Sequence, residues 1–268
     1  MKEENFPFNK SVLNGYRALV CGASKGIGKE VAKSMAKVGA DVIICSRNKD
    51  ALEKLRLELI ELGANTVTVL PLDLEEINDV TNSISKLLDD GPIHILINNA
   101  SGPPGGPLLA NDISEFETAF ERHLYASHTI TKMLVPGMEE SGIGRIVNII
   151  STSVREPIDN IGLSNTLRGA MASWSKSLSR ELHPCITINN ILPGFTNTGR
   201  LSSLANSISD KTGKEVSEIR QKWMEQVPIG RLIEPQETAL AITFLCLPSS
   251  GGIRGISMAV DGGRMRSI

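Results

Sequence analysis

The chain of 268 residues lacks an excess of charge of either sign. It contains 28 basic and 30 acidic residues, which gives a formal net charge of −2. Because nucleic acids and anionic membranes attract a basic excess, this balance argues against both as partners. No run of about eighteen apolar residues occurs, and the first ten residues include no apolar segment of signal-peptide type. We therefore expect a cytoplasmic protein that makes no membrane contact.

Cysteine and aromatic residues are also scarce. The four cysteines, Cys21, Cys45, Cys185 and Cys246, lie far apart and include no Cys-x-x-Cys pair. This spacing disfavours a zinc site or a disulfide framework, so we expect no metal and interpret all four as buried small apolar residues. Aromatic residues make up 4% of the chain, and only two are tyrosines. Tyr16 and Tyr125 are therefore the only phenols in the chain for a reaction that needs one.

What the chain does have is a regular alternation of short β-branched segments and longer amphipathic segments. This alternation predicts a single domain over residues 1–268 with a doubly wound, Rossmann-type α/β fold: a mostly parallel seven-stranded sheet with helices on both faces. Strands are expected near 17–21, 41–46, 66–70, 93–98, 145–150, 187–192 and 257–260. Helices are expected at about 26–38, 50–62, 75–88, 114–140, 161–182 and 235–247.

Two segments interrupt this alternation. Residues 102–107 read GPPGGP, which is too short for a domain linker and indicates a rigid turn beside a site. Residues 196–228 are polar and rich in serine. We expect this second segment to form a mobile flap with short helices of its own over the substrate pocket.

Three glycines lie where the first predicted strand turns into the first predicted helix. Residues 21–28 read CGASKGIG, which places Gly22, Gly26 and Gly28 in this turn. Glycine permits positive φ and lets backbone N–H groups approach a pyrophosphate at the positive end of a helix. The alternative is a tight turn that binds no ligand.

The spacing Gly-x-x-x-Gly-x-Gly resembles that of the short-chain dehydrogenase/reductase family. Further matches are Asp73-Leu74 after the third strand, NNAS at 98–101, Pro193-Gly194 with Thr198, VPIGR at 227–231 and VDGG at 260–263. The resemblance covers nearly the whole chain, and it is strongest to the single-domain reductases that include 3-oxoacyl-[acyl-carrier-protein] reductase. It implies a nicotinamide dinucleotide as cofactor.

The resemblance also implies contacts at matching residues. These are Gly22, Ser24, Lys25, Gly26, Ile27 and Gly28 at the pyrophosphate turn, Asp73 and Leu74 at adenine, Asn99 and Ala100 along the ribose, and Pro193, Gly194 and Thr198 at the nicotinamide. For Asn98 and Asn99 the alternative is a turn whose side-chain amides satisfy backbone groups.

Basic residues at the end of the second strand favour NADP(H) over NAD(H). That strand ends Cys45-Ser46-Arg47 with no carboxylate at its tip, and Lys25 lies in the glycine turn. A carboxylate there would accept the ribose 2′-hydroxyl, whereas basic groups pair with a 2′-phosphate. The alternative is that Arg47 and Lys25 are solvated surface charges.

The catalytic pattern of the family is only partly present. The resemblance assigns the serine that orients the substrate carbonyl to Ser151, although Ser151 could instead cap a strand end. By the family spacing, the tyrosine position is Ser164, the lysine position is Arg168 and the asparagine position is His123. Tyr-x-x-x-Lys occurs nowhere in the chain.

The replacement of tyrosine by Ser164 and of lysine by Arg168 changes the candidate proton donor but not the expected geometry. Ser164 and Arg168 lie one helical turn apart, on the same face of their predicted helix. An aliphatic hydroxyl is a much weaker acid than a phenol, but Arg168 is permanently charged and could hold ribose hydroxyls or a carboxylate and polarise a carbonyl. His123 is then the best proton source at neutral pH, unless it simply packs against the sheet. Tyr125, on another face of that helix, is interpreted as packing.

Two functions follow from these residues. The first is an NADP(H)-dependent oxidoreductase for a carbonyl/alcohol or another polarised double bond, in which Ser151 and Arg168 stabilise charge and His123 or water delivers the proton. The second is a nucleotide-binding, catalytically impaired sensor or oligomer partner, indicated by the missing tyrosine and lysine. The resemblance also implies a homotetramer whose middle helices pack against their mates, and Ala170-x-x-x-Trp174 is compatible with this packing.

Overall fold

The computed structural model describes residues 7–267 and centres on one seven-stranded sheet. The strand order is β3-β2-β1-β4-β5-β6-β7, and every neighbouring pair is parallel. The strands are β1 (Arg17–Cys21), β2 (Asp41–Ser46), β3 (Val67–Pro71), β4 (Ile95–Asn98), β5 (Gly144–Ile149), β6 (Ile186–Pro193) and β7 (Ser257–Val260). The predicted α/β fold class is confirmed.

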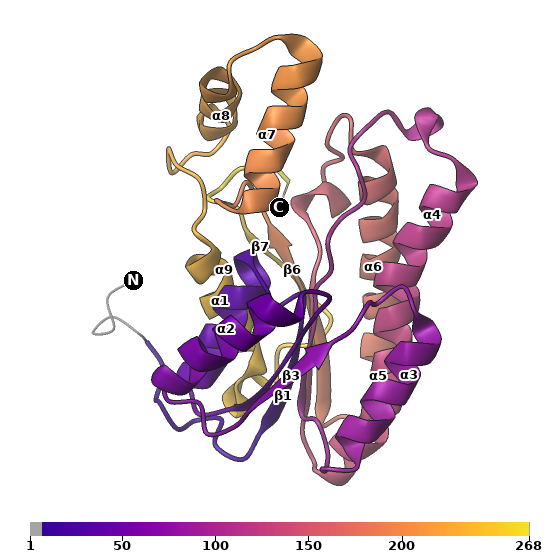
Figure 1. Ribbon diagram of the computed structural model, residues 1–268, viewed down its shortest axis with the longest axis vertical. Coiled ribbons are helices and arrows are strands. Elements are labelled where there is room, and N and C mark those ends of the chain that lie inside the picture. Colours follow the sequence, from indigo (N-terminus) through magenta and orange to yellow (C-terminus); the bar gives the residue numbers. More distant parts are fainter. Residues whose placement is uncertain (1–6, 268) are drawn as a thin grey trace.

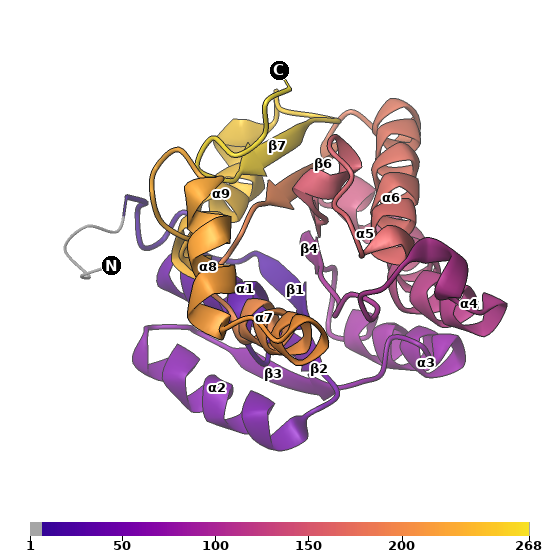
Figure 2. The same ribbon diagram turned by 90° about the horizontal axis from the view of Figure 1, so that it is seen from above.

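Helices cover both faces of the sheet, as Figures 1 and 2 show. One face carries α1 (Gly26–Lys37), α2 (Lys49–Glu61) and α9 (Pro235–Cys246), and the other carries α3 (Ile77–Leu88), α5 (Ala126–Glu140) and α6 (Gly162–Glu181). A large apolar cluster lies on each face, and both clusters draw on alternate residues of the same strands. Burial on both faces explains why the central strands are continuous apolar segments.

The long helix predicted over 114–140 is wrong in one respect. It is divided into α4 (Ile113–Phe120), a π-helical turn (Glu121–Tyr125) and α5. The wider turn buries His123 and leaves Tyr125 51% exposed, in contact with the Phe120 ring. Tyr125, interpreted as a packing residue, thus packs on Phe120 but leaves about half of its surface exposed.

A smaller difference concerns the burial of the cysteines. Cys185 is partly exposed, whereas the other three cysteines are buried as predicted.

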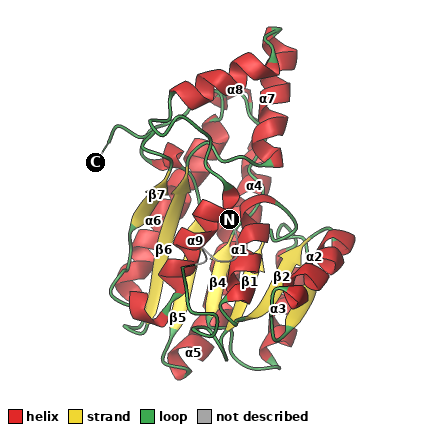
Figure 3. Cartoon of the chain, turned by 90° about the vertical axis from the view of Figure 1, so that its left-hand side faces the viewer, coloured by secondary structure: helices red, strands yellow, loops and turns green. Residues whose placement is uncertain are grey.

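The segment 196–228 contains α7 (Gly199–Thr212) and α8 (Val216–Glu225), which stand above the carboxyl edge of the sheet (Figures 1 and 3). None of the helices within residues 7–267 has the length and apolar character needed to span a membrane.

The strand order creates a switch point between β1 and β4. From β1 the chain proceeds outward to β2 and β3, whereas from β4 it proceeds outward in the other direction to β5, β6 and β7. Connections therefore diverge at the carboxyl ends of β1 and β4 and leave a crevice there, which is where open α/β sheets bind ligands. The residues that follow β1 and β4 are the glycine turn and Asn99.

Candidate active site

The glycine turn after β1 has the backbone conformation that a pyrophosphate site requires. Gly22 and Gly26 have φ of +62° and +59°. A side chain on Gly28 would overlap the Gly22 carbonyl and lie 2.7 Å from Asn99 Nδ2. Lys25 caps α1 without a side-chain hydrogen bond, and no acidic residue lies in the first turn. The first N–H groups of α1 are therefore free to bind a diphosphate, so the turn fits a dinucleotide.

Two hydrogen bonds from Asn99, which follows β4, connect this turn to the neighbouring strand. Its Nδ2 donates to the carbonyl oxygens of Cys21 at 3.2 Å and Gly22 at 3.3 Å. Asn98 has a separate role, because its Nδ2 donates to Asn148 Oδ1 at 2.8 Å, and Asn148 donates to Asn190 at 2.9 Å. This buried ladder holds β4, β5 and β6 in register. The side-chain amides thus satisfy the polar groups around the site.

The predicted nicotinamide residues follow β6 and lie beside the glycine turn. A Cβ on Gly26 would lie 3.4 Å from Thr198 Cγ2, so the loop after β6 meets the start of α1. Thr198 caps α7 by accepting from Leu201 N. Gly194 approaches the backbone of Asp261 so closely that a side chain would collide with it. Thr198 therefore lies beside the start of α1, and Gly194 lies beside the residue that follows β7.

The predicted adenine end contains a charge pair that the sequence pattern did not reveal. Arg47 is exposed at the tip of β2, and its Nη1 lies 3.6 Å from Asp73 Oδ2 at the end of β3. Lys25 is exposed in the turn, while Ser24, Ile27 and Leu74 are partly exposed. No carboxylate lies at the tip of β2 itself, but the Asp73 carboxylate, which follows the neighbouring strand β3, lies close to Arg47. A 2′-phosphate would therefore meet Arg47 next to an acidic group.

Ser151 and Arg168 are polar residues of the predicted catalytic site. Ser151 follows β5, and its Oγ accepts from Ser153 N at 3.1 Å, which leaves the hydroxyl proton free to donate. Arg168 extends from α6, and its Nη1 donates to the Ile149 carbonyl at 2.9 Å. Burial, together with the nearby charge of Arg200, lowers the pKa of Arg168 to about 10, so the guanidinium stays charged at neutral pH. Ser164 is partly exposed, and its hydroxyl has no hydrogen-bond partner in the part of the chain described.

The environment of His123 bears on its predicted role as proton source. The ring is 3% exposed, and Nε2 lies 3.0 Å from the Ser101 carbonyl oxygen. Burial, and then the charges of Arg168 and Arg122, hold the pKa of His123 well below its usual range. His123 is therefore neutral at pH 7, which means that no imidazolium is present there to donate a proton. Its Nε2 hydrogen fixes the Ser101 carbonyl instead.

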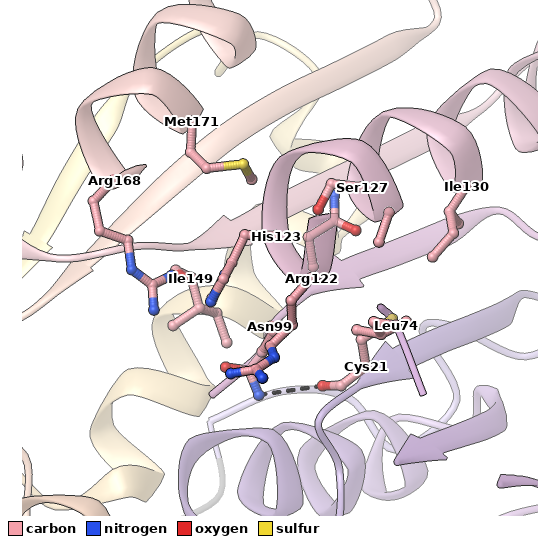
Figure 4. Close-up of a pocket in the computed structure, with 13 residues that line it drawn as sticks. Cys21, Leu74, Asn99, Arg122, His123, Ser127, Ile130, Ile149, Arg168 and Met171 are labelled. Atoms are coloured by element: carbon pink, nitrogen blue, oxygen red, sulfur yellow. Dashed lines mark hydrogen bonds between the residues drawn. The ribbon is translucent and has the colours of Figure 1, made fainter. Parts of the chain in front are cut away.

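Arg168, His123 and Asn99 are among the residues that line a small cavity, as Figure 4 shows. Ile149 and Met171 line the cavity beside Arg168, and Arg122 lines it on the side of α5. Arg122 is held by an ion pair with Glu75. The sequence pattern singled out neither this ion pair nor Met171, because each depends on residues that are distant along the chain. Ser151 is not among the residues that line this cavity.

A parallel doubly wound sheet with a glycine turn at its switch point defines a dinucleotide-binding protein. Comparison with known proteins narrows this class. The family model described as "Enoyl-(Acyl carrier protein) reductase" matches residues 22–264. The chain belongs to the short-chain dehydrogenase/reductase family of nicotinamide-dependent oxidoreductases.

Individual relatives cover almost the same span. The chain is 31% identical to the 3-oxoacyl-[acyl-carrier-protein] reductase of Aquifex aeolicus over 257 residues, which are 94% of this chain and 98% of that protein. It is 30% identical to the 7alpha-hydroxysteroid dehydrogenase of Escherichia coli strain K12 over 263 residues, 96% of each chain. The L-sorbose reductase of Gluconobacter frateurii, solved with NADPH and L-sorbose, superposes with a TM-score of 0.90 at 26% identity, covering 97% of this chain and 100% of that one.

Proposed function

We propose that the protein is an NADP(H)-dependent reductase of a carbonyl or of a carbon–carbon double bond conjugated to one, with proton delivery from water. The observation that carries this proposal is the buried, charged Arg168 at the position where the family pattern has lysine, without a phenol four residues before it. The glycine turn, Asn99 and the Pro193-Gly194-Thr198 loop would hold the cofactor. When bound, the cofactor supplies a hydride.

The side chains present suit the stabilisation of negative charge better than the donation of a proton. As the substrate accepts a hydride, its carbonyl oxygen gains negative charge. The Ser151 hydroxyl can donate to that oxygen, and the permanent charge of Arg168 stabilises it electrostatically. In a conjugated substrate the hydride adds to the β-carbon, the π electrons move to the carbonyl oxygen, and water protonates the α-carbon. This sequence needs no phenol, and so the conjugated substrates are favoured.

Three finer properties belong to the same proposal. Lys25 and Arg47 support a preference for NADPH over NADH, and NADPH in the related L-sorbose reductase agrees with it. The family relationship supports a homotetramer, and the sequence supports a cytoplasmic location. The preference is tested by calorimetric titration with both reduced nucleotides, and an NADPH affinity equal to or below that for NADH would contradict it.

The activity is tested by following NADPH oxidation against paired panels of saturated ketones and conjugated enones, enals and enoates. We expect turnover that is faster with the conjugated panel. The variant Arg168→Met should lower kcat/KM by about 100-fold, on the scale of losing one electrostatic stabiliser. Protein that binds NADPH but oxidises none of it with either panel would contradict the proposal.

The alternative is a nucleotide-binding protein with impaired catalysis, which the Ser164 and Arg168 replacements favour. The double variant Ser164→Tyr, Arg168→Lys separates the two, because it restores the phenol and the amine to one helix face. If the wild-type chain is inert and the double variant reduces ketones, the alternative holds. If the wild-type chain is already active on conjugated substrates, we expect the double variant to lose that activity.

A further inference from the structure

Arg168 carries a buried charge without a counterion. Arg168 is 8% exposed, and the hydrogen bond from Nη1 to the Ile149 carbonyl is the single hydrogen bond of its side chain among the described residues. No carboxylate of residues 7–267 forms an ion pair with it. Buried charges in proteins are normally paired, because removing them from water is costly. The Nε and Nη2 hydrogens remain available to a ligand.

A second guanidinium, that of Arg200, lies close to that of Arg168. Arg200 lies in the first turn of α7, and its Nη2 donates to the Pro103 carbonyl at 2.7 Å. A Cβ placed on Gly102 would lie 3.7 Å from Arg168 Nη2 and 3.8 Å from Arg200 Nη2. Two positive groups from different helices therefore flank one position, at which an added Cβ would be in van der Waals contact with both guanidinium groups. Arg200 also has no acidic partner within residues 7–267.

We infer that Arg168 and Arg200 together bind a carboxylate of the substrate above Gly102. This inference rests on the proposed function and narrows its substrate to a short acid, such as a 2-enoate or a 2-oxo acid. A guanidinium presents a planar fork of donors that matches a carboxylate, and one anion between two such groups removes their mutual repulsion. The first turn of α7 adds the positive end of a fourteen-residue helix.

The cofactor diphosphate is the other anion to consider. The glycine turn and the free N–H groups of α1 already provide its site, and they lie at the carboxyl end of β1. Arg168 instead lines, with His123 and Met171, a cavity whose wall also includes Asn99 and Ala100 of the predicted ribose site but none of the turn glycines (Figure 4). Because the guanidinium does not share a cavity with the glycines that would hold the diphosphate, we assign the missing anion to the substrate.

The test measures binding without turnover, in the presence of saturating NADP⁺. Wild-type protein is titrated by calorimetry with crotonate, cinnamate, pyruvate and 2-oxobutyrate, each paired with its neutral amide, and with inorganic phosphate. We expect at least one acid to bind about 10-fold or more tightly than its amide, the scale of a charge-assisted hydrogen bond. Equal affinity of every acid and its amide would overturn the inference, as would binding of phosphate alone.

Variants then identify the residue responsible. Arg200→Gln should abolish the preference for acid over amide and leave NADP⁺ affinity within about twofold, while Arg200→Lys should retain part of the preference. Arg220→Gln is the matched control, since Arg220 lies in the same flap on α8 and donates to Asn197. If Arg200→Gln weakens NADP⁺ binding and leaves the acid preference intact, Arg200 serves the cofactor and the inference fails.

The two proposals fail in different ways. Acids that bind in this manner but are not reduced by NADPH would contradict the proposed function and leave the carboxylate site standing. Reduction of neutral enones with no preference for acids in binding would support the reductase and remove the carboxylate site.

Discussion

Two buried arginines in this protein differ in what surrounds them. Arg145 is 4% exposed, and its guanidinium donates to the carbonyl oxygens of Leu247, Gly144, Cys185 and Pro248. Arg168 is 8% exposed and has a single such bond. The first is a structural crosslink, whereas the second has donors left over for the ligand that we propose, and its unpaired burial is expected to reduce stability.

This contrast predicts opposite effects for the same substitution. Arg168→Met should leave the free energy of unfolding unchanged or raise it by about 1–2 kcal/mol, because a buried unpaired charge is replaced by an apolar chain of similar length. Arg145→Met should lower it by about 2–4 kcal/mol, because several buried carbonyls lose their donor. Urea unfolding of both variants measures this. A loss in Arg168→Met as large as that in Arg145→Met would show that Arg168 is structural.

His123 gives the stability a pH dependence. Its pKa in the folded protein lies well below the unfolded value near 6.5, so between these two values the unfolded chain binds more protons. Stability is thus fully present above about pH 6.5 and is lost as the pH falls toward the folded pKa, by at most about 1.4 kcal/mol per pH unit. His94, whose pKa burial and Arg17 also lower, contributes in the same direction.

His123→Asn should therefore reduce the slope of unfolding free energy against pH between about pH 5 and 7. The control is His183→Gln, which removes an exposed imidazole after α6. Urea unfolding at a series of pH values provides the measurement. A slope in His123→Asn that equals the wild-type slope would mean that the buried ring titrates normally.

At the scale of the elements, the glycine turn shows how a close approach dictates a residue type. A Cβ added to Gly28 would collide with the Gly22 carbonyl and Asn99. By contrast, a Cβ added to Gly169, in the middle of α6, would have no atom outside its own helix within 4 Å. Gly28→Ala must push the first turn of α1 away from β1, which should cost about 1–3 kcal/mol. It should also weaken NADPH binding, since the N–H groups move with the helix.

Gly169→Ala is the matched control, and it should stabilise the protein by about 0.5–1 kcal/mol because alanine is the better helix former. Thermal unfolding with and without NADPH measures both effects. A Gly28→Ala protein with wild-type stability and wild-type stabilisation by NADPH would show that the turn does not hold the cofactor.

Elements with a strong local pattern could be predicted from the sequence. The observed bounds of β1, β2 and β7 are those predicted, because apolar runs between turn residues are local signals. The π-helical turn at Glu121–Tyr125 could not be predicted, since one additional residue in a turn barely alters the apolar periodicity of 114–140. The actual burial of His123 and exposure of Tyr125 depend on that turn.

The site shows the same division. Gly22, Gly28 and Asn99 are within reach of sequence reasoning because a spacing motif marks each of them. The Arg47–Asp73 pair, the Arg122–Glu75 pair and the approach of Arg200 to Arg168 join residues from different elements. Such pairs arise only from the strand order and from the position of α7, so spacing along the chain does not reveal them.

At the scale of the whole molecule, the two halves of the sheet carry different parts of the predicted site. The half from β1 to β3 carries the glycine turn and the basic residues of the adenine end, and the half from β4 to β7 carries Ser151, Arg168 and the flap with α7 and α8. The crevice between them brings both sets together. In the proposed function both halves would hold the cofactor, because Asn99, Ala100 and the Pro193-Gly194-Thr198 loop belong to the second half, and the substrate would meet it in this crevice.

The proposed homotetramer places the outer face of α6 against its mate. Ala170 and Trp174 lie one turn apart on α6 and are partly exposed, so a charged side chain at Ala170 would be buried in such an interface without a partner. We expect wild-type protein to elute as a tetramer in size-exclusion chromatography with light scattering, and Ala170→Glu to elute as a smaller species. Leu57→Glu is the control, because Leu57 is 56% exposed on α2, on the opposite face of the sheet, and its variant should remain tetrameric. A monomeric wild-type protein, or an Ala170→Glu tetramer as stable to dilution as wild type, would show that α6 is not the interface.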